Sequence, residues 1–241
     1  MSLVVTVYAR EGIVMAADSR LTLTFPRNIP GAAPHTVSVT SSDSARKLFL
    51  TPNRIGISTY GNAAVNGAPV AGVVESFVIE QLKDKDLPPK ETADALLAYF
   101  KAIGVSQATS FHIAGYRPTD QTLTQEVVVA DLLAGTVTNL NPPNQQGANW
   151  GGEIDIFQRL LNSVALLDAQ GNVVGPIPSF EVPFQFFTLQ DAIDFSTFAI
   201  RTTIDTMRFQ GRERTVGGPV DVIVITPDTG EWISRKQLAV A

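Results

Sequence analysis

The sequence predicts an α+β fold in which β-hairpins and amphipathic helices alternate along one chain. Two apolar runs, Leu3 to Val7 and Ile13 to Ala17, open the chain on either side of the turn Arg10-Glu11-Gly12. β-Branched runs around a Gly-containing turn are typical of a hairpin. Their nearly continuous apolar character indicates a sheet covered on both faces. Apolar residues then recur at helical spacing within 69–83 and 88–104.

The composition is that of an ordinary globular protein and predicts one domain over residues 1–241. The chain is 44% hydrophobic and 17% charged, with no internal repeat, low-complexity tract or linker. Its formal net charge of −5 argues against nucleic acid or a membrane surface as a main partner. No apolar run reaches membrane-spanning length and the N-terminus lacks signal-peptide features, so we expect a cytoplasmic protein.

The chain offers little cysteine or histidine chemistry. It contains no Cys, which excludes disulfides, thiol nucleophiles and thiolate metal sites. His35 and His112 are the only histidines, and neither has ligand-like residues near it in the sequence. We therefore expect no metal site and no Ser–His triad.

The segments after the first hairpin continue the alternation of strands and helices. Residues 26–44 are polar and interrupted by Pro, which predicts an inserted loop or protruding hairpin. A second hairpin is predicted over 45–64. Helices are predicted over 69–83 and 88–104, because Pro is tolerated in a first helical turn and Gly is suited to cap a helix end.

The second half of the chain alternates in the same way. We expect strands over 110–116, 125–133 and 136–140, a loop over 141–149, a helix over 153–167 and an irregular stretch over 168–188. Thr188 and Asp191 have the spacing of a capping box at the start of a long helix. Residues 219–226 predict a buried strand, and a last short strand follows the turn at 227–230.

The N-terminus carries the groups for a nucleophile and its base. Ser2 stands directly behind Met1, and methionine aminopeptidases remove Met when the next residue is small. Processing would leave Ser2 with a free α-amine, whose unperturbed pKa of about 7.7–8.0 lies close to working pH. Such an amine can accept the proton of the Ser2 hydroxyl, which is the N-terminal form of the nucleophile-and-base arrangement.

Three stretches of the sequence resemble proteasome β subunits. Gly12 to Arg20 is similar to the family signature Gly-Val-Val-x-Ala-Ala-Asp-x-Arg, at the same spacing from the N-terminal nucleophile. Lys47 to Gly61 matches the interval from the family's catalytic Lys to its oxyanion Gly, and Gly217 to Thr226 resembles the closing strand. Bacterial relatives of the ancestral-β-subunit (Anbu) type are the nearest class.

The resemblance implies an N-terminal-nucleophile hydrolase with a four-layer αββα sandwich, in which two antiparallel sheets are flanked by helices. Four catalytic residues follow from it. Ser2 would be the nucleophile and its α-amine the base. Lys47 would keep that amine neutral and stabilise developing negative charge. Asp18 would pair with Lys47 and hold it charged, and the Gly61 backbone N–H would form the oxyanion hole.

The resemblance also implies a substrate pocket and supporting residues. Thr59 falls where the family lines its specificity pocket, so Thr59 and Ala63 suggest a small or neutral pocket. Arg20 would order a neighbouring loop by hydrogen bonds.

Two departures from the family pattern bear on activity. The usual nucleophile is Thr, whereas this chain has Ser2. The family's Asp-x-x-Ser before the closing strand is replaced by residues 213–216. Glu213 would stand for the Asp, and Thr215 would supply the hydroxyl that Val216 lacks.

The function implied is a proteasome-type peptidase that cleaves peptide or protein substrates through an acyl-enzyme on Ser2, without a cofactor. Such proteins assemble into homo-oligomeric rings or stacks; an ATPase partner is left open. Two alternatives stay open. One is an amidase or transpeptidase of the same superfamily. The other is a catalytically inactive proteasome-like shell subunit, which Val216 or retention of Met1 would favour.

Overall fold

Two five-stranded antiparallel sheets form the centre of the fold in the computed structural model, which describes residues 2–27, 35–83, 85–120 and 122–237. The first sheet has the order β12 (Gly147–Gly152), β1 (Leu3–Ala9), β2 (Gly12–Ala17), β15 (Asp221–Ile225) and β16 (Gly230–Ser234). The second has the order β11 (Thr136–Asn139), β10 (Leu123–Asp131), β9 (Thr109–Pro118), β6 (Gly56–Gly61) and β5 (Leu48–Leu50).

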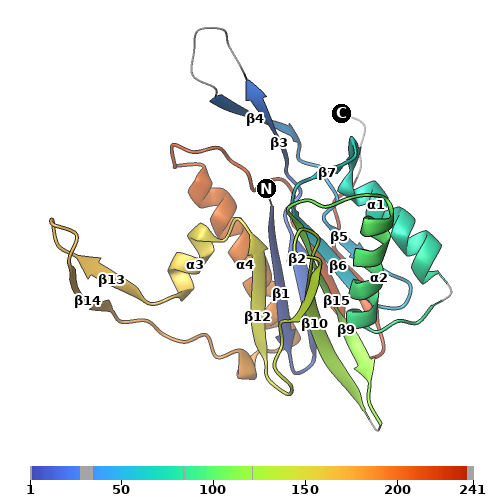
Figure 1. The fold of residues 1–241 in the computed structure, drawn as a ribbon. Coiled ribbons are helices and arrows are strands. Elements are labelled where there is room, and N and C mark those ends of the chain that lie inside the picture. The colour runs from blue at the N-terminus through green and yellow to red at the C-terminus, as the bar shows by residue number, and fades with distance from the viewer. Residues whose placement is uncertain (1, 28–34, 84, 121, 238–241) are drawn as a thin grey trace.

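Three two-stranded hairpins and the helices complete the described chain. The hairpins are β3 (Leu21–Arg27) with β4 (His35–Ser42), β7 (Ala64–Val65) with β8 (Ala68–Pro69), and β13 (Val164–Leu167) with β14 (Val173–Ile177). The helices are α1 (Val70–Phe77) continued by the π-helix η1 (Val78–Leu82), α2 (Pro89–Ala102), α3 (Asp155–Leu161), the 3-10 helix η2 (Phe184–Phe186) and α4 (Leu189–Met207). Figure 1 shows α3 and α4 on one side of the sheets and α1 and α2 on the other. None of these described helices combines the length and apolarity needed to span a membrane.

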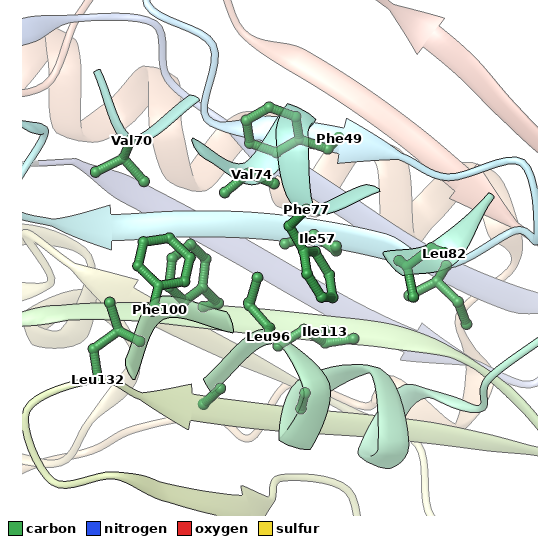
Figure 2. Close-up of a cluster of buried hydrophobic side chains, with 14 of the residues drawn as sticks. Phe49, Ile57, Val70, Val74, Phe77, Leu82, Leu96, Phe100, Ile113 and Leu132 are labelled. Atoms are coloured by element: carbon green, nitrogen blue, oxygen red, sulfur yellow. The ribbon is translucent and has the colours of Figure 1, made fainter. Parts of the chain in front are cut away.

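Buried apolar side chains join these elements in three clusters. One cluster joins the two sheets and contains Val4 and Ile223 of the first sheet with Leu48 and Ala114 from the second sheet's side. Another joins the first sheet to α3 and α4. The third joins the second sheet to α1 and α2, and Figure 2 shows its aromatic and aliphatic side chains meeting over the strands. Each sheet is therefore packed on both of its faces.

β1 and β2 lie in the middle of the first sheet because both faces of both strands are apolar. Every residue of the two strands is buried. Leu3 and Val5 of β1 belong to the cluster with α3 and α4, whereas Val4 belongs to the cluster that joins the sheets. This division follows from the alternation of side chains along a strand. The hairpin register sets Val4 opposite Ala17, so Ser2 and Asp18 come to lie at the same end of the sheet.

The predicted helix over 153–167 is wrong in its second half. α3 ends at Leu161, and the following apolar residues form β13, which pairs with β14 inside the stretch predicted as irregular. The turn explains the difference, because Asp168 Oδ1 accepts hydrogen bonds from the backbone N–H groups of Gln170 at 2.9 Å and Asn172 at 2.8 Å. Apolar spacing alone does not separate a short strand from the end of a helix.

The loop expected over 141–149 is also too long. β12 begins at Gly147 and pairs with β1 along its length, so Gly151 and Gly152 are strand residues rather than a turn before a helix. The sequence carried no alternation there, because a Gly-rich edge strand has few side chains to show one.

Two other local features agree with the sequence analysis. The capping box is present, since the Thr188 hydroxyl accepts from the Asp191 N–H at 3.2 Å and Asp191 Oδ2 accepts from the Thr188 N–H at 2.9 Å. A hairpin of β3 and β4 occurs where an inserted loop or hairpin was expected, and it projects beyond the sheets in Figure 1. Residues 28–34, which follow β3 in the sequence, lie outside the described residues.

One polar contact joins the two sheets inside the apolar cluster between them. Thr6 Oγ1 of β1 lies 3.1 Å from His112 Nδ1 of β9, and both residues are buried. The Tyr60 ring packs edge-on against the imidazole, with ring centroids 5.4 Å apart. Burial lowers the pKa of His112 to about 4, because the charged imidazolium would lose its hydration.

This buried imidazole should make the fold acid-sensitive. Between pH 6.5, the ordinary pKa, and pH 4 the unfolded chain binds a proton at His112 that the folded chain does not, so stability falls as the pH falls. We expect His112 to account for a loss of about 2–3 kcal/mol in the free energy of unfolding between pH 7 and pH 4.5. Urea denaturation at both pH values, with His112→Gln as the comparison, measures it. The His112→Gln protein should lose less stability over this range, and an equal loss in both proteins would be evidence against this assignment.

Candidate active site

The first hairpin brings the start of the chain against Asp18. The Leu3 N–H donates to Asp18 Oδ1 at 3.0 Å, and the Asp18 N–H donates to the Leu3 carbonyl at 3.3 Å. These two bonds extend the β1–β2 ladder by one step beyond Ala17. Ser2, which precedes Leu3, is therefore fixed at the end of the sheet where Asp18 lies.

The Asp18 carboxylate is fully buried and accepts four hydrogen bonds. Oδ1 accepts from the Leu3 N–H and from Lys47 Nζ at 2.8 Å, and Oδ2 accepts from the N–H groups of Arg20 and Gly217, both at 3.0 Å. A buried charge is tolerated only when it is paired and hydrogen-bonded. Asp18 meets that condition with one donor from its own turn, the Arg20 N–H, and three donors that are distant in the sequence, from Leu3, Lys47 and Gly217.

Lys47 lies just before β5, and its side chain is 6% exposed. Burial lowers the pKa of Lys47, because the ammonium loses its hydration, while the Asp18 carboxylate opposes that effect. The positive charges of Lys236 and Arg20 lower the pKa further. The site thus holds a lysine whose proton is more easily released than that of an exposed lysine.

Ser2 is held by its backbone and lies beside two cavities. Its carbonyl accepts from the Glu153 N–H at 2.8 Å. Gly152 has a positive φ of 100°, and a Cβ at that position would lie 1.8 Å from the Ser2 carbonyl oxygen. Gly61, with φ of 101°, similarly leaves no room for a Cβ beside the Ala108 carbonyl. Both glycines are required by the close approach of backbone to backbone.

The two cavities meet at Ser2. The first has a volume of about 170 Å³ and is lined by Ser2, Lys47, Thr59, Gly61 and Ala63 among others. The second has a volume of about 320 Å³ and is lined by residues that include Ser2, Gly61, Asp131 and Glu153. Tyr60 lines both cavities. Ser2 therefore belongs to the wall of both cavities, together with Tyr60 and Gly61.

Arg20 joins two loops next to Asp18, those that contain Asp43 and Arg214. Its guanidinium binds both oxygens of Asp43, at 2.7 and 2.8 Å, and donates to the Arg214 carbonyl at 3.1 Å. The pair raises the pKa of Arg20 and lowers that of Asp43, since each charge stabilises the other. Gly217 lies directly against the guanidinium, where a Cβ would come within 2.5 Å. Arg20 does not line either cavity at Ser2.

The segment 213–216 departs from what the resemblance implied. The Glu213 carboxylate makes no hydrogen bond or ion pair within the described residues, and it lines neither cavity at Ser2. Val216 is buried in the cluster with α3 and α4. Thr215 is buried, and its hydroxyl has no hydrogen-bond partner among the described residues. The structure therefore places Thr215 in the interior, whereas the Glu213 carboxylate has no contact of this kind among the described residues.

The sequence analysis missed three residues of the site. Tyr60 lines both cavities, and Gly152, which has no Cβ, leaves room for the Ser2 backbone. Lys236 donates to the Ser19 hydroxyl at 3.0 Å and forms an ion pair with Asp221, so the chain after β16 returns to the edge of the site. The pair Gly151-Gly152 was the one available signal, since paired glycines in a strand indicate close backbone approach. Nothing in the local sequence distinguished Tyr60 or Lys236.

The predicted removal of Met1 falls outside the described residues. In the part of the chain that the structure describes, no group of three or more His, Asp or Glu side chains is arranged to hold a metal ion.

Comparison with known proteins bears on the fold. No protein-family model matches the chain, and no curated protein matches it. Among the solved structures that match is a mutant of Anbu from Hyphomicrobium sp. strain MC1, with 16% sequence identity and a TM-score of 0.57. The match covers 98% of this chain and 86% of the Anbu chain. The chain is thus similar in fold to Anbu over nearly its whole length.

The four hydrogen bonds to Asp18 predict that Asp18→Ala lowers the free energy of unfolding much more than Asp43→Ala does. Asp18→Ala would leave three backbone N–H groups and the Lys47 ammonium buried without an acceptor, at a cost of about 3–5 kcal/mol in the free energy of unfolding. Asp43→Ala breaks a more exposed pair and should cost about 1 kcal/mol or less. Urea denaturation of both variants tests this, and similar losses would contradict the central position of Asp18.

Proposed function

We propose that this chain is an N-terminal-nucleophile hydrolase of the proteasome type, which cleaves amide bonds of peptide or protein substrates with Ser2 as nucleophile. The observation that carries the proposal is the position of Ser2, between two cavities and next to the buried Lys47–Asp18 pair. The likeness in fold to Anbu supports it. We propose further that residues 1–241 form a single domain, with its sheets and helices arranged as the four-layer αββα sandwich of such hydrolases.

The proposed reaction begins once Met1 has been removed. The Ser2 hydroxyl passes its proton to the freed α-amine, and Oγ attacks the carbonyl carbon of the amide. The Gly61 N–H stabilises the oxyanion together with the positive charge of Lys47. The α-ammonium returns the proton to the departing amine, which leaves an ester on Ser2. Water, deprotonated by the same amine, then releases the acid and restores the hydroxyl.

Lys47 and Asp18 set the electrostatics of these steps. An ammonium beside the terminal amine lowers the pKa of that amine, so more of it is neutral and able to accept the proton. Asp18 holds Lys47 in place at 2.8 Å and neutralises its charge in the interior.

Two other predicted residues have a place in the proposal. Thr215 has a buried hydroxyl without a partner among the described residues, and we assign it the role of orienting the freed α-amine. Thr59 and Ala63 line the smaller cavity beside Ser2. Its volume of about 170 Å³ suits a small, uncharged side chain on the acyl side of the scissile bond.

The proposal includes a homo-oligomeric ring or stack of this chain in the cytoplasm. The basis is the resemblance to proteasome β subunits of the Anbu type and, for the compartment, a sequence without Cys.

Two competing functions also have observations in their favour. The small acyl-side cavity also suits an amidase or transpeptidase that acts on a small amide. Product analysis with a peptide and a free amine separates these from a peptidase. An inactive shell subunit is favoured by Val216, which is packed in the core, and by the lack of contacts of Glu213 within the described chain.

A serine-reactive probe tests the proposed nucleophile. We expect covalent labelling of Ser2, complete loss of labelling in Ser2→Ala, and a fall of about 100-fold or more in labelling rate in Lys47→Ala, because the buried cation is removed. Lys90→Ala is the matched control, since this exposed lysine forms an ion pair with Asp94 in the same helix. Mass spectrometry of the labelled peptide gives the readout. Labelling at another residue, or an unchanged rate in Lys47→Ala, would contradict the mechanism.

A further inference from the structure

The hairpin of β13 and β14 stands away from the rest of the fold. We call residues 163–179, which contain both strands and their turn, the arm. β13 and β14 pair with each other, and neither has another strand partner or an extensive contact with another described element. In Figure 1 the arm extends outward beyond α3, away from both sheets. Both outer edges of this two-stranded sheet are therefore open.

The arm is apolar on both faces. Its large apolar strand residues are between 38% and 70% exposed, and they are Val164, Leu166, Leu167, Val173, Val174 and Ile177. Neither strand contains a charged residue. Phe180, which directly follows the arm, is 92% exposed. Isolated exposed apolar residues are normal on proteins, but a continuous group of this kind marks an interaction surface.

Hydrogen bonds at both ends of the arm nevertheless define its hairpin conformation. At the tip, the Asp168 carboxylate accepts from the N–H groups of Gln170 and Asn172 and from the Asn172 side chain. These bonds lower the pKa of Asp168, because they stabilise its charged form. At the root, the hydroxyls of Ser163 and Ser179 lie 3.3 Å apart and close the hairpin. Because the turn and the base of the hairpin are both hydrogen-bonded, the two strands are held together with their apolar side chains exposed.

An apolar two-stranded hairpin of this kind is stable only when another surface packs against it. An isolated two-stranded sheet is at best marginally stable in water, because it buries little apolar surface. Open strand edges with apolar side chains also pair readily with another chain. Soluble proteins usually protect such edges with charges or Pro, and the only residue of that kind in the two strands is Pro176. A partner that covers the apolar strands and their open edges would therefore stabilise the arm.

We propose that the partner is a second copy of this chain, whose arm packs against the first arm across a two-fold axis. Other large exposed apolar residues lie in the segments that flank the arm, such as Leu160 of α3, Phe186 of η2 and Phe198 of α4. A second arm differs from these in that it offers uncharged strands with open edges, which can pair with the open edges of the first arm. Two chains of net charge −5 repel each other, and uncharged strands are where they can approach at least cost.

Charges at the two ends of the arm fit the same arrangement. Asp168 lies at the tip, and Arg159 lies in the last turn of α3, just before the root. Neither forms an ion pair within the described residues. Two arms that lie antiparallel across a two-fold axis bring the tip of each toward the root of the other, as a self-complementary interface requires. This inference takes its occupant from the homo-oligomer of the proposed function, and it does not depend on the proposed chemistry.

Single cysteines test the arm-to-arm contact cleanly, because the chain has no Cys of its own. Ala165→Cys places a thiol on β13 and Val174→Cys places one on β14, and Ala102→Cys at the end of α2 serves as the control for random collisions. With a short thiol cross-linker and dilute protein, we expect covalent dimers from at least one arm variant and none from the control. Failure of both arm variants would overturn the proposal.

Charge placed on the arm supplies an independent test. We expect Leu167→Asp and Val174→Asp each to weaken self-association at least 10-fold, measured by light scattering over a concentration series, with the circular dichroism of the fold retained. Ile79→Asp, at a similarly exposed residue outside the arm, is the control and should leave association unchanged. An unchanged assembly in the arm variants, or a wild-type chain that is monomeric, would refute the arm contact. Loss of probe labelling at Ser2 with an intact dimer would count only against the proposed chemistry.

Discussion

The structure depends on the buried ion pair between Lys47 and Asp18. Asp18 accepts hydrogen bonds from Leu3, Arg20, Gly217 and Lys47, and so joins the chain start, the end of β2, the loop before β15 and the segment before β5. Removing one partner of such a pair costs several kcal/mol, because the other charge is left buried and unpaired. The first residues of the chain are therefore held by the same carboxylate that holds the lysine.

The packing of the sheets makes this pair possible. β1 and β2 are covered on both faces, which removes water from the end of the sheet where Asp18 lies. In a water-poor environment the attraction between opposite charges grows, and so does the cost of an unpaired charge. Gly152 and Gly61 complete the arrangement, because the absence of a Cβ lets backbone segments close around Ser2 and at the cavity wall. The physical result is a buried Ser2 that lines two cavities.

The extent to which the sequence predicts this molecule varies along the chain. The β1–β2 hairpin and the helices packed on the second sheet follow from apolar periodicity, which is a local signal. The β13–β14 hairpin does not, because apolar spacing in a short segment suits a helix end equally well and the Asp168 turn decides between them. The sequence analysis did not identify three residues of the site, Tyr60, Gly152 and Lys236, for a different reason. Their roles come from contacts with segments far away in the sequence, which local pattern does not encode.

The central claim is that the functional chain begins at Ser2, with a free α-amine beside its hydroxyl. The most direct test is the intact mass of the native protein, together with the sequence of its first residues. The account predicts a mass that corresponds to residues 2–241 and a first residue of Ser2. A native protein that retains Met1 would have its Ser2 nitrogen in a peptide bond, unable to accept a proton, and would contradict the proposed catalysis while leaving the fold and the Lys47–Asp18 pair intact.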